Sequence, residues 1–257
     1  MVCPTPLHSR DLEQTRLHRM RLQENVNLLY WYKHLYEHLF EGFGPTSGVK
    51  ILEIGSGASP LKLFRPDVIT SDVLELEYLD HAFDCHEINR YDGIEDSSID
   101  VITLTNVLHH LKDPIQFLRH ARMKLKETGA IWMVEPYFSV VSTPIYRWFH
   151  HEPVQFGIKH PVLDEIEGPL STANQAIPYL MFVTKRNWLD PLAGHYNLER
   201  LEIEHFSSIS YMMSGGMSWR IPLPGWLYRA WFPVDELLAK RWPRIFASFF
   251  VVRLHCR

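Results

Sequence analysis

The chain has 257 residues, 46% of them hydrophobic, which is enough to build a core in one large domain or two small ones. Its formal net charge of -4 is spread along the sequence and disfavours a nucleic-acid backbone as partner. The odd number of cysteines, Cys3, Cys85 and Cys256, is typical of reduced thiols in a cytoplasmic protein. The longest apolar run, over 246–252, is too short to span a bilayer, so no transmembrane anchor is expected.

Apolar residues at helical spacing over 11–41 predict one or two amphipathic helices, which the helix breakers of "EGFGP" then end. We expect residues 1–46 to form a helical lid over a ligand site, with Tyr32 as a candidate contact. An ordinary packed helix is the alternative interpretation.

From Val49 onward the pattern changes to short β-rich runs separated by helical segments. These runs are apolar nearly throughout, as in parallel strands buried on both faces. They cover residues 49–55, 67–72, 83–88, 100–105 and 130–136. A helix is predicted over 113–127, opening on Asp-Pro and ending in basic residues. This alternation predicts an α/β fold with a doubly wound, Rossmann-like sheet, whose cofactor-binding half is 47–137.

The alternation lapses after Pro136. Residues 138–197, rich in Pro, His and aromatic residues, are interpreted as a substrate-cap insertion. Runs at 198–208 and 244–256 predict the sixth and seventh strands of a mostly parallel sheet. Between them, 209–243 forms a second aromatic-rich insertion, so that 198–257 completes a single domain.

The segment "ILEIGSGASP" (51–60) passes from a buried strand through two glycines to a proline. Gly55 and Gly57 permit a tight turn and close approach of the backbone to a ligand. Ser59 is placed to cap the next helix, and Pro60 to occupy its first position. Pro60 also replaces the third glycine of a dinucleotide fingerprint, which disfavours a dehydrogenase.

Two acidic residues end the first two predicted strands. Glu53 stands before the turn, where it would repel a pyrophosphate and attract an ammonium or sulfonium. Asp72 follows nineteen residues later, about the interval at which an acidic side chain meets ribose hydroxyls in such folds. Together the turn and the two acids indicate a nucleoside with a cationic end.

On "ILEIGSG" (51–57), "ITSDV" (69–73), "EDSSIDVITLTNVLHHLKDP" (95–114) and "LKETGAIWMVEP" (125–136), the sequence resembles the class I S-adenosylmethionine-dependent methyltransferases. The likeness is greatest to the group that includes ubiquinone/menaquinone and small-molecule methyltransferases. It implies S-adenosylmethionine as cofactor, with the methionine end near Glu53, Gly55, Ser56 and Gly57, the ribose at Asp72, the adenine edge at Val73 and the sulfur beside Thr105. Relatives commonly carry an aspartate for the adenine amino group; the nearest counterpart is Asn89 or, in a shifted register, Asp92.

The resemblance also implies candidates for proton transfer. His109 and His110 follow the fourth strand and Glu135 ends the fifth, where such groups flank an acceptor oxygen in some O-methyltransferases. The alternative is that the histidines only pack or shape the cofactor site. His150, His151, Glu152 and His160 match no zinc or facial-triad spacing, so no metal is predicted.

The insertions are dense in aromatic residues, which either pack as core, line a pocket or contact a lipid surface. They are Trp148, Phe149, Trp219, Trp226, Tyr228, Trp231, Phe232 and Trp242. The sequence thus predicts methyl transfer to a small-molecule or lipid-linked acceptor, at oxygen, with peripheral membrane contact as one option. A non-catalytic scaffold with this fold is one alternative, and an RNA or protein methyltransferase is a second. The absence of a basic face disfavours RNA, and no "N/D-P-P-Y/F"-type tetrapeptide, which many amino-group nucleic-acid methyltransferases carry, follows the fourth strand.

Overall fold

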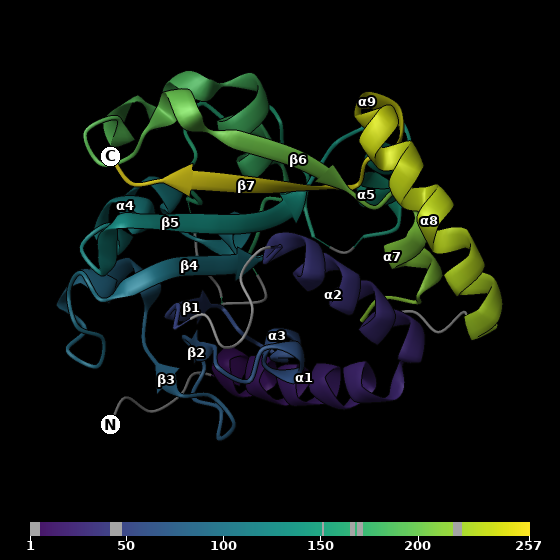
Figure 1. Cartoon of the computed structure of the whole chain (residues 1–257), viewed down its shortest axis with the longest axis horizontal. Coiled ribbons are helices and arrows are strands. Elements are labelled where there is room, and N and C mark those ends of the chain that lie inside the picture. The colour runs from purple at the N-terminus through teal and green to yellow at the C-terminus, as the bar shows by residue number, and fades with distance from the viewer. Residues whose placement is uncertain (1–5, 42–47, 151, 165–167, 169–171, 218–222) are drawn as a thin grey trace.

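A single seven-stranded sheet runs through the computed structural model, which describes residues 6–41, 48–150, 152–164, 168, 172–217 and 223–257. The strand order is β3-β2-β1-β4-β5-β7-β6, and only β7 runs antiparallel to its neighbours (Figure 1). The bounds are β1 Ile51–Ile54, β2 Ile69–Asp72, β3 His81–Ala82, β4 Ile99–Thr105, β5 Leu125–Pro136, β6 Glu202–Phe206 and β7 Phe249–His255. The predicted mostly parallel seven-stranded sheet is confirmed.

The helices comprise longer segments around the sheet and short turns that connect its strands. The α-helices are α1 Pro6–Glu24, α2 Val26–Leu39, α3 Pro60–Phe64, α4 Pro114–Ala121, α5 Ser142–Trp148, α6 Ala176–Tyr179, α7 Ser210–Met213, α8 Gly225–Arg241 and α9 Pro243–Phe246. Short 3-10 or π segments are η1 Cys85–Arg90, η2 Leu108–His110, η3 Leu180–Thr184, η4 Arg186–Leu192 and η5 Leu198–Arg200. None of the helices that the structure describes is long and apolar enough to cross a bilayer.

The sheet is covered on both faces because neighbouring residues of its central strands point to opposite sides. Ile51 of β1 packs in the core that contains the apolar face of α2 together with Tyr228 and Phe232 of α8. Leu52 packs in the other core, with α4 and the segment 176–192. A doubly wound sheet places ligands at the carboxyl ends of its parallel strands. In Figure 1 these ends point toward α2, α5, α7 and α8.

Two sequence-based element assignments are wrong in detail. Residues 83–88 were expected as a strand, but only His81–Ala82 pairs with β2, and η1 follows. Asp84 begins η1 by accepting a hydrogen bond from the His86 backbone N–H, a local contact that competes with extended structure. The helix expected over 113–127 begins at its Asp113 cap but ends at Ala121, because β5 already starts at Leu125.

The second insertion is held against the sheet by one buried acid. Asp235 of α8 accepts hydrogen bonds from the backbone N–H groups of Ser208 and Ile209 at 2.7 and 2.8 Å. The hydroxyls of Ser207 and Ser210 donate to the same carboxylate. A carboxylate with four donors is a specific anchor for α8, since leaving a buried charge unpaired is strongly unfavourable.

Candidate active site

The glycine turn joins β1 to α3 through backbone that few side chains allow. Gly55 and Gly57 have φ of +66° and +49°, in the left-handed region where glycine carries no steric penalty. A Cβ on Gly55 would lie 2.6 Å from the Val107 side chain, which follows β4. The first glycine therefore permits the close approach of β1 to the β4 turn.

The residues after the turn depart from one expectation. Pro60 occupies the first helical position, as predicted. Ser59, however, is in the left-handed conformation at φ +54° and makes no side-chain cap bond, so its predicted capping role is wrong. Its buried hydroxyl has no protein partner among the described residues. Ser56 serves the turn instead: its backbone N–H donates to Ser71 O at 2.9 Å, tying the turn to β2.

Asp72 closes β2 directly beside the turn. Its carboxylate accepts hydrogen bonds from the backbone N–H of Gly57 at 2.8 Å and of Leu74 at 2.9 Å. Burial raises the pKa of Asp72, while these bonds oppose the rise. Val73, the next residue, is exposed. The predicted ribose and adenine-edge positions thus lie together at the end of β2.

Glu53 is buried at the end of β1 and holds an unsatisfied acceptor. Its Oε2 has no hydrogen-bond partner in the described part of the chain. Burial, reinforced by the charge of Asp72, raises the pKa of Glu53 to about 8, although Ser56 and Lys62 oppose it. A cation bound at this carboxyl would stabilise its charged form.

The N-terminal helices lie over this turn. Arg19 of α1 donates to Ala58 O at 2.8 Å and stacks on the Tyr78 ring at 3.9 Å, and the Tyr78 hydroxyl donates to Gly57 O. Burial raises the pKa of Tyr32 and Tyr36 of α2, and the charge of Glu53 adds to the rise in both. Helix α1 therefore contacts the turn through Arg19, and Tyr32 and Tyr36 of α2 pack in the same core as Ala58 and Leu61, which follow the turn.

Several buried oxygens around this edge have no hydrogen-bond partner within the described residues, and such groups carry a free-energy cost that a ligand can remove. They are Glu53 Oε2, Ser59 Oγ, Asn89 Oδ1 and Asn106 Oδ1. They belong to β1 and to the segments that follow β1, β3 and β4. An adenosyl ligand with an amino-acid end carries N–H and O–H donors, so this set fits S-adenosylmethionine.

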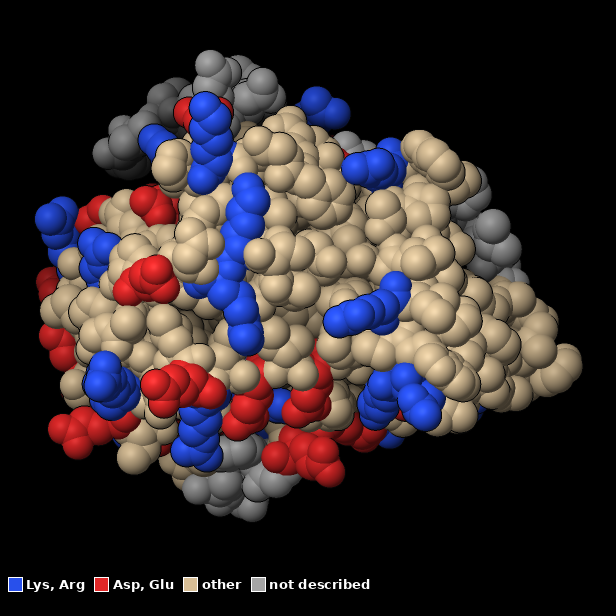
Figure 2. All heavy atoms as spheres, turned by 90° about the horizontal axis from the view of Figure 1, so that it is seen from above, with Lys and Arg blue, Asp and Glu red and all other residues tan. Residues whose placement is uncertain are grey.

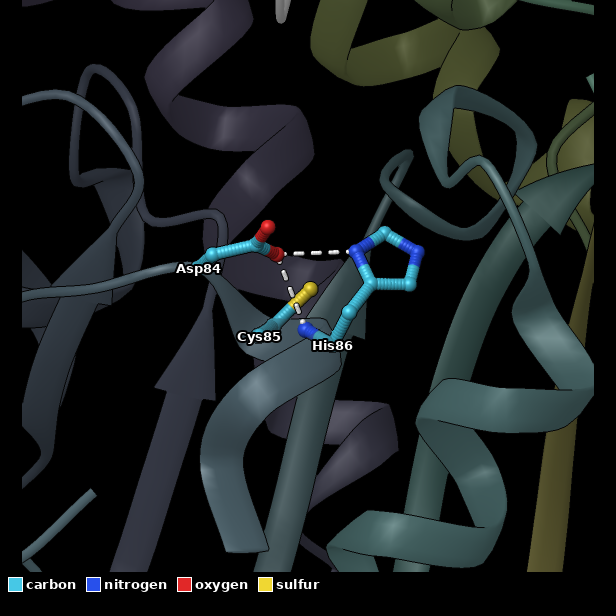
Figure 3. Close-up of side chains that lie close together, drawn as sticks. All are labelled: Asp84, Cys85 and His86. Atoms are coloured by element: carbon cyan, nitrogen blue, oxygen red, sulfur yellow. Dashed lines mark hydrogen bonds and ion pairs between the residues drawn. The ribbon is translucent and has the colours of Figure 1, made fainter. Parts of the chain in front are cut away.

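An acid that the sequence interpretation did not consider, Asp84, begins the segment that follows β3. Asp84 lies two residues after β3 and meets the His86 ring, whereas Asn89 lies near the end of η1 and Asp92 beyond it. Figure 3 shows Asp84 contacting both the ring and the backbone N–H of His86. Because the helical η1 replaced the expected strand, the acid nearest the strand end is Asp84. The only sign of Asp84 in the sequence is its position, directly after a short apolar run.

Asp84, Cys85 and His86 also bring three metal-ligand types together, but their chemistry argues against a metal ion. His86 Nε2 accepts from the Asp113 backbone N–H at 3.2 Å, so its other nitrogen, Nδ1, carries the proton that it donates to Asp84. Burial raises the pKa of the Cys85 thiol well above its usual value, which disfavours the thiolate that a metal requires.

The turn after β4 is organised around Glu135, a fully buried residue near the end of β5. One carboxylate oxygen accepts from the backbone N–H groups of Val107 and Leu108 at 3.0 and 2.7 Å, and the other contacts His109 Nδ1 at 2.5 Å. Both carboxylate oxygens are occupied by these described residues, so Glu135 can act on a methyl acceptor only through His109. Its geometry is that of a positioning residue, which fixes the imidazole orientation.

Glu152, from the first insertion, faces the other side of His109. Its carboxylate lies 3.2 Å from His109 Nε2 and 3.5 Å from His110 Nε2, and Gln175 donates to it at 2.8 Å. Burial alone would lower the pKa of His109, but Glu135 and then Glu152 overcome burial and raise it to about 10. Hydrogen bonds from His109 and His110 likewise outweigh burial and hold the pKa of Glu152 far below its usual range.

Sequence reasoning named Glu152 only in a metal hypothesis, because nothing in the primary structure relates residue 152 to residues 109 and 110. His151, named with it, lies outside the described residues, as does Trp219. His160 is exposed. The ligand atoms of His109, His110 and Glu152 lie within 4.8 Å of one another. In this structure the carboxylate of Glu152 itself occupies the space between the two imidazoles.

Two tyrosines connect Glu152 with the cofactor end. Tyr146 of α5 is buried and Tyr211 of α7 is partly buried; burial raises the pKa of both, and the charge of Glu152 adds to the rise in each. Tyr211 also lies close enough to Tyr32 to contribute to its raised pKa. Both Tyr146 and Tyr211 pack on Phe249 of β7, which pairs with Pro136, so they lie together near the carboxyl end of β5.

Comparison with known proteins agrees with this geometry. Residues 68–131 match the family model described as a methyltransferase domain. A curated relative, the polyketide synthase-nonribosomal peptide synthetase TwmB of Talaromyces wortmannii, is 30% identical over 133 residues, covering 45% of this chain. The chain spans only 4% of the length of that relative.

Solved structures of similar fold have low sequence identity. A SAM-dependent methyltransferase from Archaeoglobus fulgidus is 16% identical, with a TM-score of 0.47 over 94% of each chain. The N-methyltransferase NodS from Bradyrhizobium japonicum, in complex with S-adenosyl-L-homocysteine, is 12% identical, with a TM-score of 0.45 over 96% of this chain and 98% of its own. The strand order and the glycine turn with its two acids agree with the family model, so residues 68–131 and the sheet around them are similar to a class I S-adenosylmethionine-dependent methyltransferase domain.

Proposed function

We propose that the protein transfers a methyl group from S-adenosylmethionine to an oxygen of a small-molecule or lipid-linked acceptor. The observation that carries this proposal is His109, held between two carboxylates at the sheet edge that carries Glu53 and Asp72. When bound, the cofactor supplies a methyl group on a sulfonium, whose transfer is an in-line displacement. The protein then has to align the acceptor and remove its proton.

The group that would take the proton of the methyl acceptor is His109 Nε2. Glu135 accepts the hydrogen bond of His109 Nδ1 and so directs Nε2 away from the sheet, toward Glu152. Because Glu135 and Glu152 raise the pKa of His109 to about 10, the imidazole can accept a proton only in its neutral form, at alkaline pH. In that form it takes the proton of an acceptor hydroxyl beside Nε2 and Glu152, and Glu135 stabilises the imidazolium that results. His110, whose Nδ1 contacts Thr172 O at 3.0 Å, fixes Glu152 from the other side.

Oxygen is favoured over nitrogen by this base. An amine that is already neutral attacks a sulfonium without losing a proton first, whereas a hydroxyl gains nucleophilicity as its proton leaves. A buried imidazole backed by a carboxylate supplies such a base. The alternative, a scaffold without activity, predicts no methyl transfer to any acceptor.

The proposal is tested by incubating the protein with S-adenosylmethionine carrying a labelled methyl group and with panels of phenols, hydroxy acids and polyprenyl-linked alcohols. Label in an ether or ester is the expected result, and His109→Gln is expected to lower kcat by about 10²–10⁴-fold. The matched control is His160→Gln, an exposed histidine of the insertion, with unchanged kcat. Label on nitrogen or carbon would contradict the oxygen assignment. Cofactor binding without transfer to any acceptor would favour the scaffold.

A further inference from the structure

One face of the molecule exposes large apolar side chains from α5, α8 and α9 and the residues beside them. Trp148 and Phe149 are 76% and 71% exposed, Trp226 is 74% exposed and Leu237 is 62% exposed. The set comprises Val140, Trp148, Phe149, Trp226, Leu227, Val234, Leu237, Trp242 and Ile245. We call it the α5–α8–α9 face. Exposed apolar residues gathered in this number mark an interaction site.

The helix α8 is apolar on both sides, which an ordinary surface helix is not. Its inward side is buried at Tyr228, Phe232 and Ala239, at helical spacing. Its outward side carries Trp226, Ala230, Val234 and Leu237, where polar residues are expected. The inward side packs on α2 and is held by the Asp235 hydrogen bonds. The apolar residues of the outward side stay exposed to solvent, so they are available to a binding partner.

The fully exposed charges on these three helices are all basic. Exposed basic side chains on the three helices are Arg147, Arg229, Lys240, Arg241 and Arg244, and their acidic residues are the buried Asp235 and the half-buried Glu236. This differs from the whole chain, whose formal charge is -4. In Figure 2 the right-hand end, where α8 lies, shows Lys and Arg among uncharged residues, while most acidic side chains lie to the left and along the lower rim.

The three helices form one continuous face. The backbone N–H groups of Val140 and Val141, just before α5, donate to Arg244 O and Ile245 O of α9 at 3.1 and 3.0 Å. Trp242 links α8 to α9 and lies under the Arg241 guanidinium at 5.6 Å. Figure 1 shows α5, α8 and α9 gathered at one end of the molecule.

We propose that the α5–α8–α9 face docks on the surface of an anionic lipid bilayer. Tryptophan and aliphatic side chains on helices that lie flat insert about 5–10 Å into the headgroup region. Arginine and lysine at their rim pair with anionic headgroups. A protein partner would have to present a matching acidic rim around an apolar centre, whereas an anionic bilayer offers both features over any area.

The docking face lies at the acceptor end of the active site. Tyr146 of α5 is buried with its ring 6.0 Å from that of His150, which lies 3.8 Å from Glu152, while Trp148 and Phe149, at the end of the same helix, are exposed. Tyr211 of α7 packs with Tyr146 on Phe249, and Ser208 and Ile209, just before α7, donate to Asp235 of α8. A lipid-linked acceptor therefore has a short route from bilayer to site. The entry of a lipid-linked acceptor rests on the proposed function, whereas docking on the bilayer does not.

The test is flotation of the full-length protein with vesicles, without cofactor or acceptor. Vesicles of phosphatidylcholine alone are compared with an equimolar mixture of phosphatidylcholine and phosphatidylglycerol. We expect binding to the mixed vesicles, weakened by added salt and much reduced for the neutral vesicles.

Two sets of variants examine the two components of the face. Combining Trp226→Ser with Leu237→Ser is expected to weaken binding roughly tenfold or more, and Arg229→Gln or Arg241→Gln about fivefold each. The controls are Met20→Ser and Arg90→Gln, exposed residues elsewhere, with unchanged binding. All variants should keep the same thermal midpoint, because every substituted side chain is exposed.

Docking is overturned if neither vesicle type binds, if neutral and anionic vesicles bind equally, or if the face variants bind like the controls. Concentration-dependent self-association that Trp226→Ser and Leu237→Ser abolish, without any vesicle binding, would show a protein interface instead. Failure of the methyl-transfer assay leaves the flotation result intact, so the two proposals fail separately.

Discussion

At the scale of single residues, Glu53 makes stability depend on pH. Its pKa is raised by burial from its ordinary value to about 8, so the folded protein holds a proton there that the unfolded chain releases above about pH 4.5. The contribution to stability is therefore complete below pH 4.5 and is lost as the pH rises to 8, by at most about 1.4 kcal/mol per pH unit.

We expect Glu53→Gln to flatten the decline of the free energy of unfolding between about pH 5 and pH 8, measured by urea unfolding without cofactor. The same variant should bind S-adenosylmethionine more weakly than wild type, and most clearly above about pH 8, where wild type carries the charge. Glu204→Gln, a partly exposed acid on β6, is the matched control. An unchanged pH dependence in Glu53→Gln would refute the assignment.

Glu135 and His109 give a second residue-scale prediction, for the catalytic pH profile. Glu135 raises the pKa of His109 more than any other neighbour does. Glu135→Gln should therefore move the basic requirement of kcat/KM to lower pH, because burial then dominates and lowers the pKa of the imidazole. The maximal rate should also fall, since the amide holds His109 less firmly. A lower rate with the profile unmoved would show that Glu135 is only structural.

At the scale of elements, the β1–α3 turn and the β4–η2 turn pack directly against each other at Gly55 and Val107. Gly55→Ala combines a positive φ with a clash against Val107, so we expect a loss of about 1–3 kcal/mol in the free energy of unfolding, measured by urea denaturation. Gly157→Ala is the matched control: no atom lies within 4 Å of its Cβ position, and its φ is not positive. Its free energy of unfolding should stay within about 0.5 kcal/mol of wild type. Equal stability of the two variants would contradict the close approach.

The elements also show where pattern reasoning works. The strands β1, β2, β4 and β5 were predicted because continuous apolar runs bounded by turn residues determine buried strands locally. The expected strand over 83–88 failed because the side chain of Asp84 caps η1, a local hydrogen bond that hydrophobicity does not report. The helix α8 escaped prediction because apolar residues lie on both its buried and its exposed side.

At the scale of the whole molecule, the candidate cofactor site joins the sheet to α1 through the contact of Arg19 with the glycine turn. A ligand that binds only the folded state stabilises it by about 2.7 kcal/mol at roughly a hundredfold excess over Kd. For a chain of this size this corresponds to a rise of roughly 5–10 °C in Tm with S-adenosylhomocysteine. Asp72→Ala should lose most of the rise, whereas Asp96→Ala, on the exposed turn before β4, should keep it. Absence of any shift in wild type would remove the cofactor assignment.

The sequence by itself determined the sheet, the glycine turn and the positions of Glu53, Asp72, His109 and Glu135, because each belongs to or follows a strand whose apolar run is legible locally. Only the tertiary structure decided that Glu152 and Tyr211 join this site and that Asp84 stands nearest the end of β3. The same holds for the exposed outer side of α8. These contacts join segments that are distant in the sequence, and long-range packing leaves no periodic trace in the chain.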